Sequence, residues 1–336
     1  MALDDAGVPP LAFLQLLHSQ ALDPHAIARF RSIMAGEGTN ETTLVEHDVQ
    51  VPLRWFRQVY PELDIDQATG LGLAFAEQAQ LMSFGPLSLP LVSAGSVVEI
   101  VELLTYLPLI STALSPQFHP SDHGLTVGLT GHTGDPGLDC LVVAYCGSAL
   151  LRLLDMLAGD MPTVTLNLSW SAPASRTKHE EALAGRLFFD APASFLHVPA
   201  DALNDVCRFA DPVAYRLAIA DLQRTLSHRS GTTSFSERVR RLLEEYPGTG
   251  TGQEVADELS VSTSTLKRRL CEEGTTFREL RQSFLRERAM LRLLDRSVPV
   301  SEIAADLGYS DLTNFSHAFK RWTGQSPSEF RHTRSS

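Results

Sequence analysis

Two groups of polar and basic side chains have the composition that suits contact with nucleic acid. The groups lie 48 to 49 residues apart in a chain of 336 residues. Lys and Arg side chains donate hydrogen bonds to guanine O6 and N7 or to phosphate oxygens. The predicted contact residues are Thr263, Ser264, Thr265, Lys267 and Arg268 in the first group, and Thr313, Asn314, Ser316, His317, Lys320 and Arg321 in the second.

The second group lies in a segment that has the pattern of two helices joined by a tight turn. Gly308 is expected to end the first helix, because glycine enters left-handed backbone conformations without steric cost. Ser310 is expected to cap the second helix, which Gly324 and Pro327 then end. The apolar residues that repeat at helical spacing are Ile303, Ala304, Leu307, Leu312, Phe315, Phe319 and Trp322.

The first group lies in a segment, 255–270, that repeats this pattern. Ser260 stands at the turn where Gly308 stands in the second copy, and Ser262 is expected to cap the following helix. The other matched pairs are Ala256 with Ala304, Leu259 with Leu307, Leu266 with Phe315, and Leu270 with Phe319. Two helices that cross at such a turn predict a helix-turn-helix unit, whose second helix enters the DNA major groove.

The two units are separated by a segment, 277–294, that predicts one unbroken amphipathic helix. A rigid linking helix would let the two units reach successive major-groove segments, about 34 Å apart, on one face of DNA. The apolar side of this helix is predicted to consist of Phe277, Leu280, Phe284, Leu285, Ala289 and Leu293.

Two helix-turn-helix units joined by one long helix resemble the DNA-binding domain of the AraC/XylS family of bacterial transcription regulators. The resemblance is carried by IAADLGYSD at 303–311, NFSHAFKRWTG at 314–324, SPSEFR at 326–331 and STLKRRL at 264–270. It implies a regulator, more often an activator, whose partners are double-stranded promoter or operator DNA and RNA polymerase.

Charge is divided unevenly along the chain, whose formal net charge is -12. Residues 231–336 hold 16 basic and 15 acidic residues, a net of +1, whereas residues 1–230 hold 12 and 25, a net of -13. Local clustering of basic groups sets the attraction for phosphate. We therefore expect the C-terminal part to bind DNA, and the acidic N-terminal part to avoid both DNA and anionic membranes.

Residues 1–230 predict an α+β domain, with helices first and strands within 113–145, 163–170 and 188–198. GPLSLPLVSAGSVVEIVELLTYL at 85–107 and FDAPASFLHVPADALN at 189–204 resemble the arabinose-binding-like effector domain found in one branch of the same family. This resemblance implies ligand sensing and self-association as a homodimer. The sequence does not locate the effector site. Arg54 and Arg57 are candidate anchors for an acidic ligand, but arginines of this kind are more often surface residues.

The boundary between the domains is predicted in the polar stretch 228–233, giving domains 1–230 and 231–336. Three capping boxes are predicted, in which a Ser or Thr at the N-cap pairs with a Glu three residues later. They are Ser96 with Glu99, Ser234 with Glu237, and Thr251 with Glu254.

Other candidate sites are weak. The glycines at 248–252 lack the lysine of a phosphate-binding loop and predict a turn, and 128–137 predicts a hairpin loop. The spacing of His119, Asp122, His123, His132, Asp135 and Asp139 fits no pattern of metal ligands. We therefore expect no metal and no cofactor.

The four cysteines form no CxxC pair, which predicts buried, reduced thiols in the cytoplasm. The first ten residues lack the basic region of a signal peptide. The longest apolar stretch, Leu141 to Leu151, is shorter than the roughly 18 residues that a membrane span needs.

The sequence thus predicts an α+β sensor domain followed by an all-α DNA-binding domain, in a regulator under effector control that is not an enzyme. Two alternatives stay open. One is a regulator fused to an enzymatic or cysteine-reactive sensor, which would need an activated cysteine. The other is a DNA binder that responds to no ligand.

Overall fold

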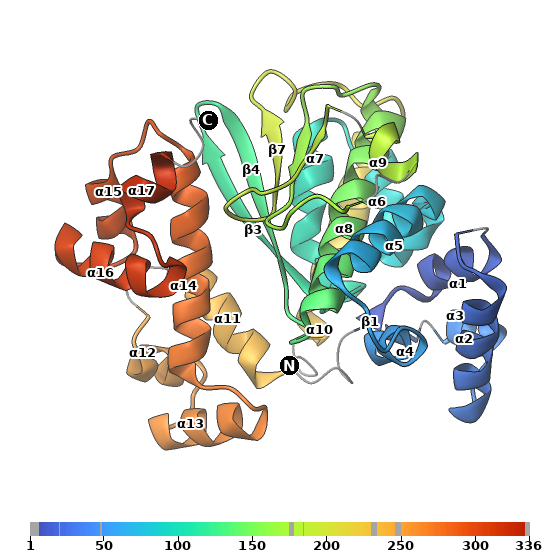
Figure 1. The fold of residues 1–336 in the computed structure, drawn as a ribbon, viewed down its shortest axis with the longest axis horizontal. Helices are drawn as coiled ribbons and strands as arrows, with labels where there is room; N and C mark the ends of the chain where they lie inside the picture. Colours follow the sequence, from blue (N-terminus) through green and yellow to red (C-terminus); the bar gives the residue numbers. More distant parts are fainter. Residues whose placement is uncertain are drawn as a thin grey trace. The chain divides into compact units, whose positions relative to one another are not determined.

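The computed structural model describes residues 7–19, 21–47, 49–174, 178–183, 185–229, 234–245 and 250–332. They form two compact units, an N-terminal unit that ends at His228 and a C-terminal unit that begins at Arg229 (Figure 1). Most of the predicted linker at 228–233 lies outside the described residues. The predicted domain boundary after residue 230 therefore stays a prediction.

The N-terminal unit begins with a layer of short helices around an aromatic cluster. Asp23 caps α2, accepting hydrogen bonds from the backbone N–H groups of His25 and Ala26, both at 2.9 Å. Phe13, Phe30 and Phe56 meet edge to face, with ring centroids 5.1 to 5.9 Å apart. The elements are β1 Gly7–Val8, α1 Pro10–His18, α2 Pro24–Gly36, α3 Glu41–Glu46, β2 Val51–Pro52, which pairs with β1, and α4 Leu53–Val59.

A pair of helices, α5 and α8, forms the centre of this unit. A Cβ atom on Gly72 would lie 2.7 Å from the carbonyl oxygen of Leu141, so glycine permits this close crossing. The helix α8 is long and apolar enough to cross a membrane. However, 78% of its most apolar 18-residue stretch is buried inside the protein, as in the core helix of a globular domain. The helices here are α5 Ile65–Gln78, η1 Leu81–Leu87, α6 Ser88–Ser93, α7 Val97–Glu102, η2 Leu103–Leu109 and α8 Pro136–Ala158.

A five-stranded sheet with the order β3-β4-β7-β5-β6 completes the N-terminal unit. Neighbouring strands are antiparallel except β5 and β6, which are parallel. The strands are β3 Leu114–Ser121, β4 Gly124–Gly131, β5 Thr165–Asn167, β6 Leu187–Phe188 and β7 Phe195–Pro199, and the remaining helices are α9 Lys178–Ala182 and α10 Pro212–Arg229. The predicted α+β class is confirmed.

The C-terminal unit is helical throughout its described residues. The helices are α11 Phe235–Glu245, α12 Gly252–Glu258, α13 Thr263–Glu272, α14 Phe277–Leu294, α15 Val300–Asp306, α16 Leu312–Thr323 and α17 Pro327–His332. The long α14 has the predicted bounds and lies between the two helix pairs (Figure 1). Its apolar side joins one core with Leu266, Leu270, Phe315 and Phe319.

Two local predictions in the N-terminal unit were wrong. Residues 128–137 form no hairpin loop, because Gly128 to Gly131 lie in β4 and Pro136 already begins α8. The box of Ser96 and Glu99 does not form, because the Glu99 carboxylate instead accepts from the backbone N–H of Gly95 at 2.6 Å. The Glu237 side chain and residues 246–249 lie outside the described part, so the predictions there are not tested.

Candidate nucleic-acid interface

The first helix pair, α12 and α13, has well-formed caps and a strained turn. The predicted box forms: Glu254 Oε2 accepts from the Thr251 N–H at 2.8 Å, and Thr251 Oγ1 accepts from the Glu254 N–H at 3.2 Å. Ser260 takes a left-handed backbone with φ of 53°. Ser262 Oγ then accepts from the Thr265 N–H at 3.2 Å and starts α13.

The second pair, α15 and α16, repeats this geometry with one correction. Gly308 takes the left-handed turn with φ of 78°, and Gly324 ends α16 with φ of 80°. The cap of α16 is Asp311 rather than Ser310, since Asp311 Oδ1 accepts from the Asn314 N–H at 2.7 Å. The extra residue of the second copy therefore precedes the cap, and a carboxylate at 311 takes the role that Ser262 has in the first copy.

The predicted contact residues of the first group lie on the outer side of α13. Thr263, Ser264, Lys267 and Arg268 are exposed and Thr265 is half-buried, while the inward Leu266 and Leu270 are 3% and 0% exposed. The Ser264 and Thr265 hydroxyls lie 2.9 Å from Ser262 Oγ. Arg268 Nη1 pairs with Glu272 Oε1 at 2.6 Å in an exposed contact. Lys267 and Arg268 therefore supply the accessible positive charge of this helix face.

The second group has a similar arrangement on α16. Its exposed members are Thr313, Asn314, His317, Lys320 and Arg321, and Ser316 is half-buried. The Asn314 amide already donates to Asp311 Oδ2 at 2.5 Å, so this side chain belongs to the cap in the free protein. Leu312, which belongs to the apolar residues that repeat at helical spacing, is nevertheless 45% exposed at the start of the helix.

Three basic residues outside the predicted contact groups hold the helices of the C-terminal unit together. Arg269 Cζ lies 5.2 Å from the centre of the Phe235 ring. Arg281 Nε donates to the carbonyl oxygen of Gly250 at 3.1 Å, and Arg292 Nη2 contacts Asp306 Oδ2 at 2.5 Å. Arg269 thus ties α13 to α11, whereas Arg281 and Arg292 tie α14 to the segment before α12 and to α15.

Two further residues that the motifs did not reveal support the helix pairs. Tyr309, directly after the turn glycine, packs edge to face on Phe315 and Trp322, with centroids 5.5 and 6.3 Å apart. Glu273 caps α11 from the end of α13, accepting from the N–H groups of Phe235 at 2.7 Å and Ser236 at 2.8 Å. Sequence spacing could not reveal Glu273, because this cap joins residues 37 and 38 positions apart.

The other candidate sites of the N-terminal unit have structural partners. Arg54 pairs with Glu37 at 2.7 Å, and Arg57 pairs with Asp135. Asp139 accepts from the Thr133 N–H and hydroxyl at 2.8 and 2.7 Å, although burial raises its pKa. Within the described ranges, no three His, Cys, Asp or Glu side chains gather in a way that could hold a metal ion.

Two cysteines differ from the prediction of buried thiols, since Cys271 is exposed and Cys146 is half-buried. Burial raises the pKa of Cys140 to about 11, of Cys146 to about 12 and of Cys207 to about 11. A thiol with so high a pKa stays protonated near neutral pH and is a poor nucleophile.

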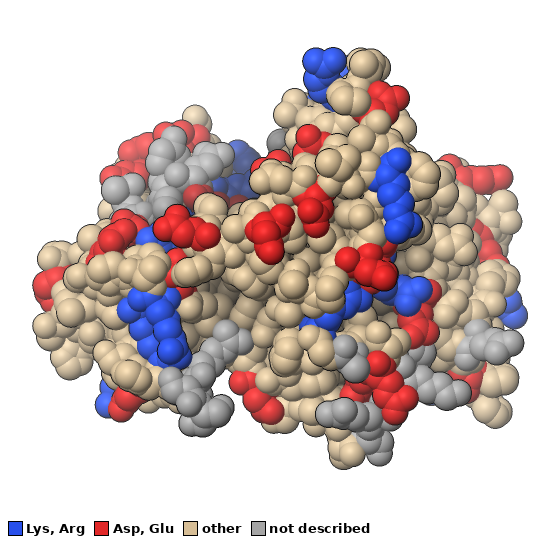
Figure 2. Space-filling view, turned by 90° about the horizontal axis from the view of Figure 1, so that it is seen from above, with Lys and Arg blue, Asp and Glu red and all other residues tan. Residues whose placement is uncertain are grey.

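Acidic side chains are spread over the face of the molecule in Figure 2, with the basic ones in a few separate groups. This agrees with the acidic net charge of -12. Positive charge is therefore local rather than a property of the whole surface, as in the exposed Lys267 and Arg268 of α13 and Lys320 and Arg321 of α16.

Comparisons with known protein families match both units. The family described as a helix-turn-helix domain matches residues 255–333. The family described as the N-terminal arabinose-binding domain of AraC transcription regulator matches residues 30–205.

Individual relatives are transcription regulators. The chain is 26% identical over 277 residues to the HTH-type transcriptional regulator VqsM of Pseudomonas aeruginosa, covering 78% of this chain and 83% of that protein. It is 28% identical over 186 residues to the ornithine utilization regulator of the same species, covering 55% of each. The transcriptional activator AggR of Escherichia coli is 29% identical over 131 residues, 38% of this chain and 49% of that protein. The crystal structure of CdpR from Pseudomonas aeruginosa aligns with a TM-score of 0.41 and 22% identity, covering 93% of this chain and 99% of that one.

Proposed function

Because the chain belongs to the AraC family of transcription regulators, we propose that it binds specific double-stranded DNA sequences and that a small-molecule effector controls this binding. The observation that carries the DNA-binding part is the repeated geometry of α12–α13 and α15–α16. Each pair has a capped second helix behind a left-handed turn, and that helix turns polar and basic side chains outward. This is the arrangement by which helix-turn-helix proteins enter the major groove.

The proposed contacts follow from exposure and charge. Lys267, Arg268, Lys320 and Arg321 bind phosphates or guanine, and His317 reaches a base edge. Arg268 must leave Glu272 to bind DNA. An exposed ion pair of this kind is worth at most about 1 kcal/mol, so the exchange costs little.

Effector control is proposed for the N-terminal unit, which matches a ligand-binding family. An effector that binds two conformations unequally shifts the population that is competent to bind DNA or RNA polymerase. Activation, as in AggR, and action in the cytoplasm are parts of the same proposal.

Self-association is proposed for the face around α10. Val206, Phe209, Val213 and Leu217 are 74%, 58%, 59% and 68% exposed. Val213 and Leu217 are four residues apart and share one side of α10. Exposed apolar groups that share one side of a helix favour burial against a second copy of the chain.

The alternative of a cysteine-reactive sensor is weaker. The pKa values of Cys140, Cys146 and Cys207 are all raised by burial, which is the reverse of thiol activation. The alternative of a DNA binder without an effector depends on whether the N-terminal unit binds a ligand at all.

The decisive experiment selects duplexes from a random-sequence pool with the full-length protein, and then measures affinity by fluorescence anisotropy across a salt series. We expect an enriched sequence, tighter binding to it than to its scrambled form, and affinity that falls as salt rises. A variant with both Lys267→Ala and Arg268→Ala should lose this preference. Arg278→Ala, which removes an exposed charge from α14, is the matched control. Absence of any enriched sequence would contradict the proposal.

A further inference from the structure

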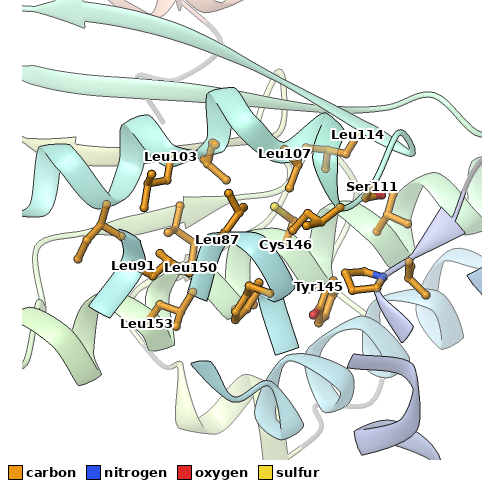
Figure 3. A pocket seen from close by; sticks show the side chains of 18 residues that line it. Leu87, Leu91, Leu103, Leu107, Ser111, Leu114, Tyr145, Cys146, Leu150 and Leu153 are labelled. Carbon is orange, nitrogen blue, oxygen red and sulfur yellow. The ribbon is translucent and has the colours of Figure 1, made fainter. Parts of the chain in front are cut away.

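The N-terminal unit contains a partly open cavity of about 70 Å³ that the sequence did not reveal. Its walls come from η1, α6, α7, η2 and α8, together with Val8 of β1, Pro9 and Leu114 of β3. Figure 3 shows that the lining is drawn out, with Leu91, Leu103 and Leu153 toward one end and Ser111 and Tyr145 toward the other. Such a shape suits an unbranched chain better than a fused ring system.

The lining is apolar along almost its whole length. Among the described residues that line it, the polar side chains are Ser111, Tyr145 and Cys146, and none carries a full charge. Burial raises the pKa of both Tyr145 and Cys146, so both groups are neutral at physiological pH. A carboxylate or ammonium group would therefore enter this cavity without a partner of opposite charge, which is strongly unfavourable.

The polar end has hydrogen-bonding capacity that the protein itself leaves unused. Tyr145 is 8% exposed, and its hydroxyl oxygen is buried without a hydrogen-bond partner in the described part of the chain. A buried hydroxyl in this state is rare, because its desolvation is not compensated. Ser111 Oγ, at the same end, donates to the carbonyl oxygen of Gly7 at 2.7 Å and accepts from the Ala113 N–H at 3.2 Å, which leaves it one further lone pair.

We propose that this cavity is the effector site, and that it takes a neutral aliphatic molecule with one hydrogen-bonding head group, such as an alcohol or a ketone. The alkyl chain lies among the leucines of α6, η2 and α8, and the head group reaches the end with Ser111 and Tyr145. A sugar would leave several hydroxyls unpaired among these leucines. The assignment rests on the proposed effector control of this unit.

The test measures binding to the full-length protein by isothermal titration calorimetry at pH 7. The probes are 2-butanone and 1-butanol, whose size suits a cavity of about 70 Å³ better than a longer chain would, with butanoate as the anion of equal chain length and L-arabinose as the polar comparison. We expect both neutral probes to bind, butanoate to bind at least tenfold more weakly, and arabinose not to compete. Equal or tighter binding of butanoate, or no binding of either neutral probe, would overturn the proposal.

Two variants locate the binding. Ala149→Phe places a ring in the cavity and should weaken both neutral probes at least tenfold, whereas Ala35→Phe, an equal change on the exposed side of α2, should not. Tyr145→Phe removes only the hydroxyl and keeps the packing, so it tests the site even if Ala149→Phe impairs folding. It should weaken the binding of 1-butanol at least threefold. Unchanged binding in Tyr145→Phe and in folded Ala149→Phe would place the probes elsewhere.

DNA binding by the same preparations separates this inference from the proposed function. Specific DNA binding with no probe bound would remove only the inferred ligand class. Probe binding at the cavity without any specific DNA binding would leave the ligand class intact and contradict the regulator.

Discussion

Ser260 and Gly308 occupy the same position in the two helix pairs and share a left-handed backbone, with φ of 53° and 78°. Glycine adopts this conformation freely, whereas a residue with a Cβ atom pays roughly 1–2 kcal/mol. The first helix pair therefore keeps a strained serine where the second has the unstrained residue. The turn is set by the packing of the two helices and not by the residue that occupies it.

Replacing Ser260 with glycine should accordingly stabilise the C-terminal unit. We expect Ser260→Gly to raise the free energy of unfolding by about 1 kcal/mol, less a part lost to the greater freedom of glycine in the unfolded chain. Urea denaturation followed by circular dichroism measures the change. Gly308→Ser is the reciprocal control and should destabilise the unit by a similar amount. A loss of stability in Ser260→Gly would show that the serine side chain has another role.

The proposed base contacts predict that single variants lose more affinity for the selected sequence than for random DNA. Arg268→Ala or His317→Ala should weaken binding to the selected sequence by roughly 1–3 kcal/mol, with little change on random DNA. Anisotropy on both duplexes at one salt concentration gives the comparison, and Arg278→Ala serves as the charge control. An equal loss on both duplexes would instead assign the residue to a phosphate.

The helices of the C-terminal unit were predictable because their apolar residues repeat at helical spacing and their ends are marked locally. The bounds of α14 agree with the predicted helix 277–294 at both ends, and the capping box of Thr251 and Glu254 forms as expected. Ser310 failed as a cap because Asp311, one residue later, offers a carboxylate to the same N–H groups. Local pattern alone does not choose between two adjacent capping residues.

Features that join distant segments could not be predicted in this way. The leucines that line the cavity repeat along their helices with the same spacing as leucines of the filled core. Leu103 faces the cavity, whereas Leu141 of α8 is a core residue whose carbonyl lies against α5. Which leucine lines a space depends on how α8 and η2 pack in three dimensions. The sequence therefore predicted a sensor domain but not its site.

The corrected cap predicts a contrast between two neighbouring residues. Asp311→Ala should cost about 1 kcal/mol, because it leaves the first N–H groups of α16 without an acceptor. Ser310→Ala should be close to neutral, since the Ser310 hydroxyl contacts only the Asp311 carboxylate at 3.4 Å. Thermal unfolding of the two variants in parallel decides between them. A larger effect at Ser310 would restore the cap that the sequence favoured.

The Glu273 cap predicts a pH dependence at the start of α11. Burial acts to raise the pKa of Glu273, but hydrogen bonds from Ser236 and Phe235 outweigh it and hold the pKa below its ordinary value of 4.5. A carboxylate with a lowered pKa contributes stability that is fully present above its unfolded pKa and is lost as the pH falls through the folded value. Glu273→Gln should therefore speed amide exchange in α11 at pH 7.

The difference in exchange rate between Glu273→Gln and the wild type should shrink as the pH falls below 4.5. Protonation then removes the Glu273 charge from the wild type, and the variant lacks this charge at every pH. Hydrogen exchange across 235–245 in the full-length protein, corrected for the intrinsic rate at each pH, measures it. The control is Glu272→Gln, an exposed glutamate at the end of α13. It is preferred to Glu279→Gln because Glu279 caps α14. A difference that persists unchanged into acid would exclude the carboxylate charge as its cause.

The exposed apolar residues of α10 predict a change in oligomeric state. Leu217→Glu places a charge on the side of α10 that also carries Val213, and burying that charge against a second copy would be costly. We expect the wild-type protein to sediment as a dimer at micromolar concentration and the variant to sediment mainly as a monomer. Val45→Glu alters an exposed valine on α3 and should leave the dimer unchanged. If the wild type is monomeric, or if both variants remain dimeric, α10 is not the contact between two copies of the chain.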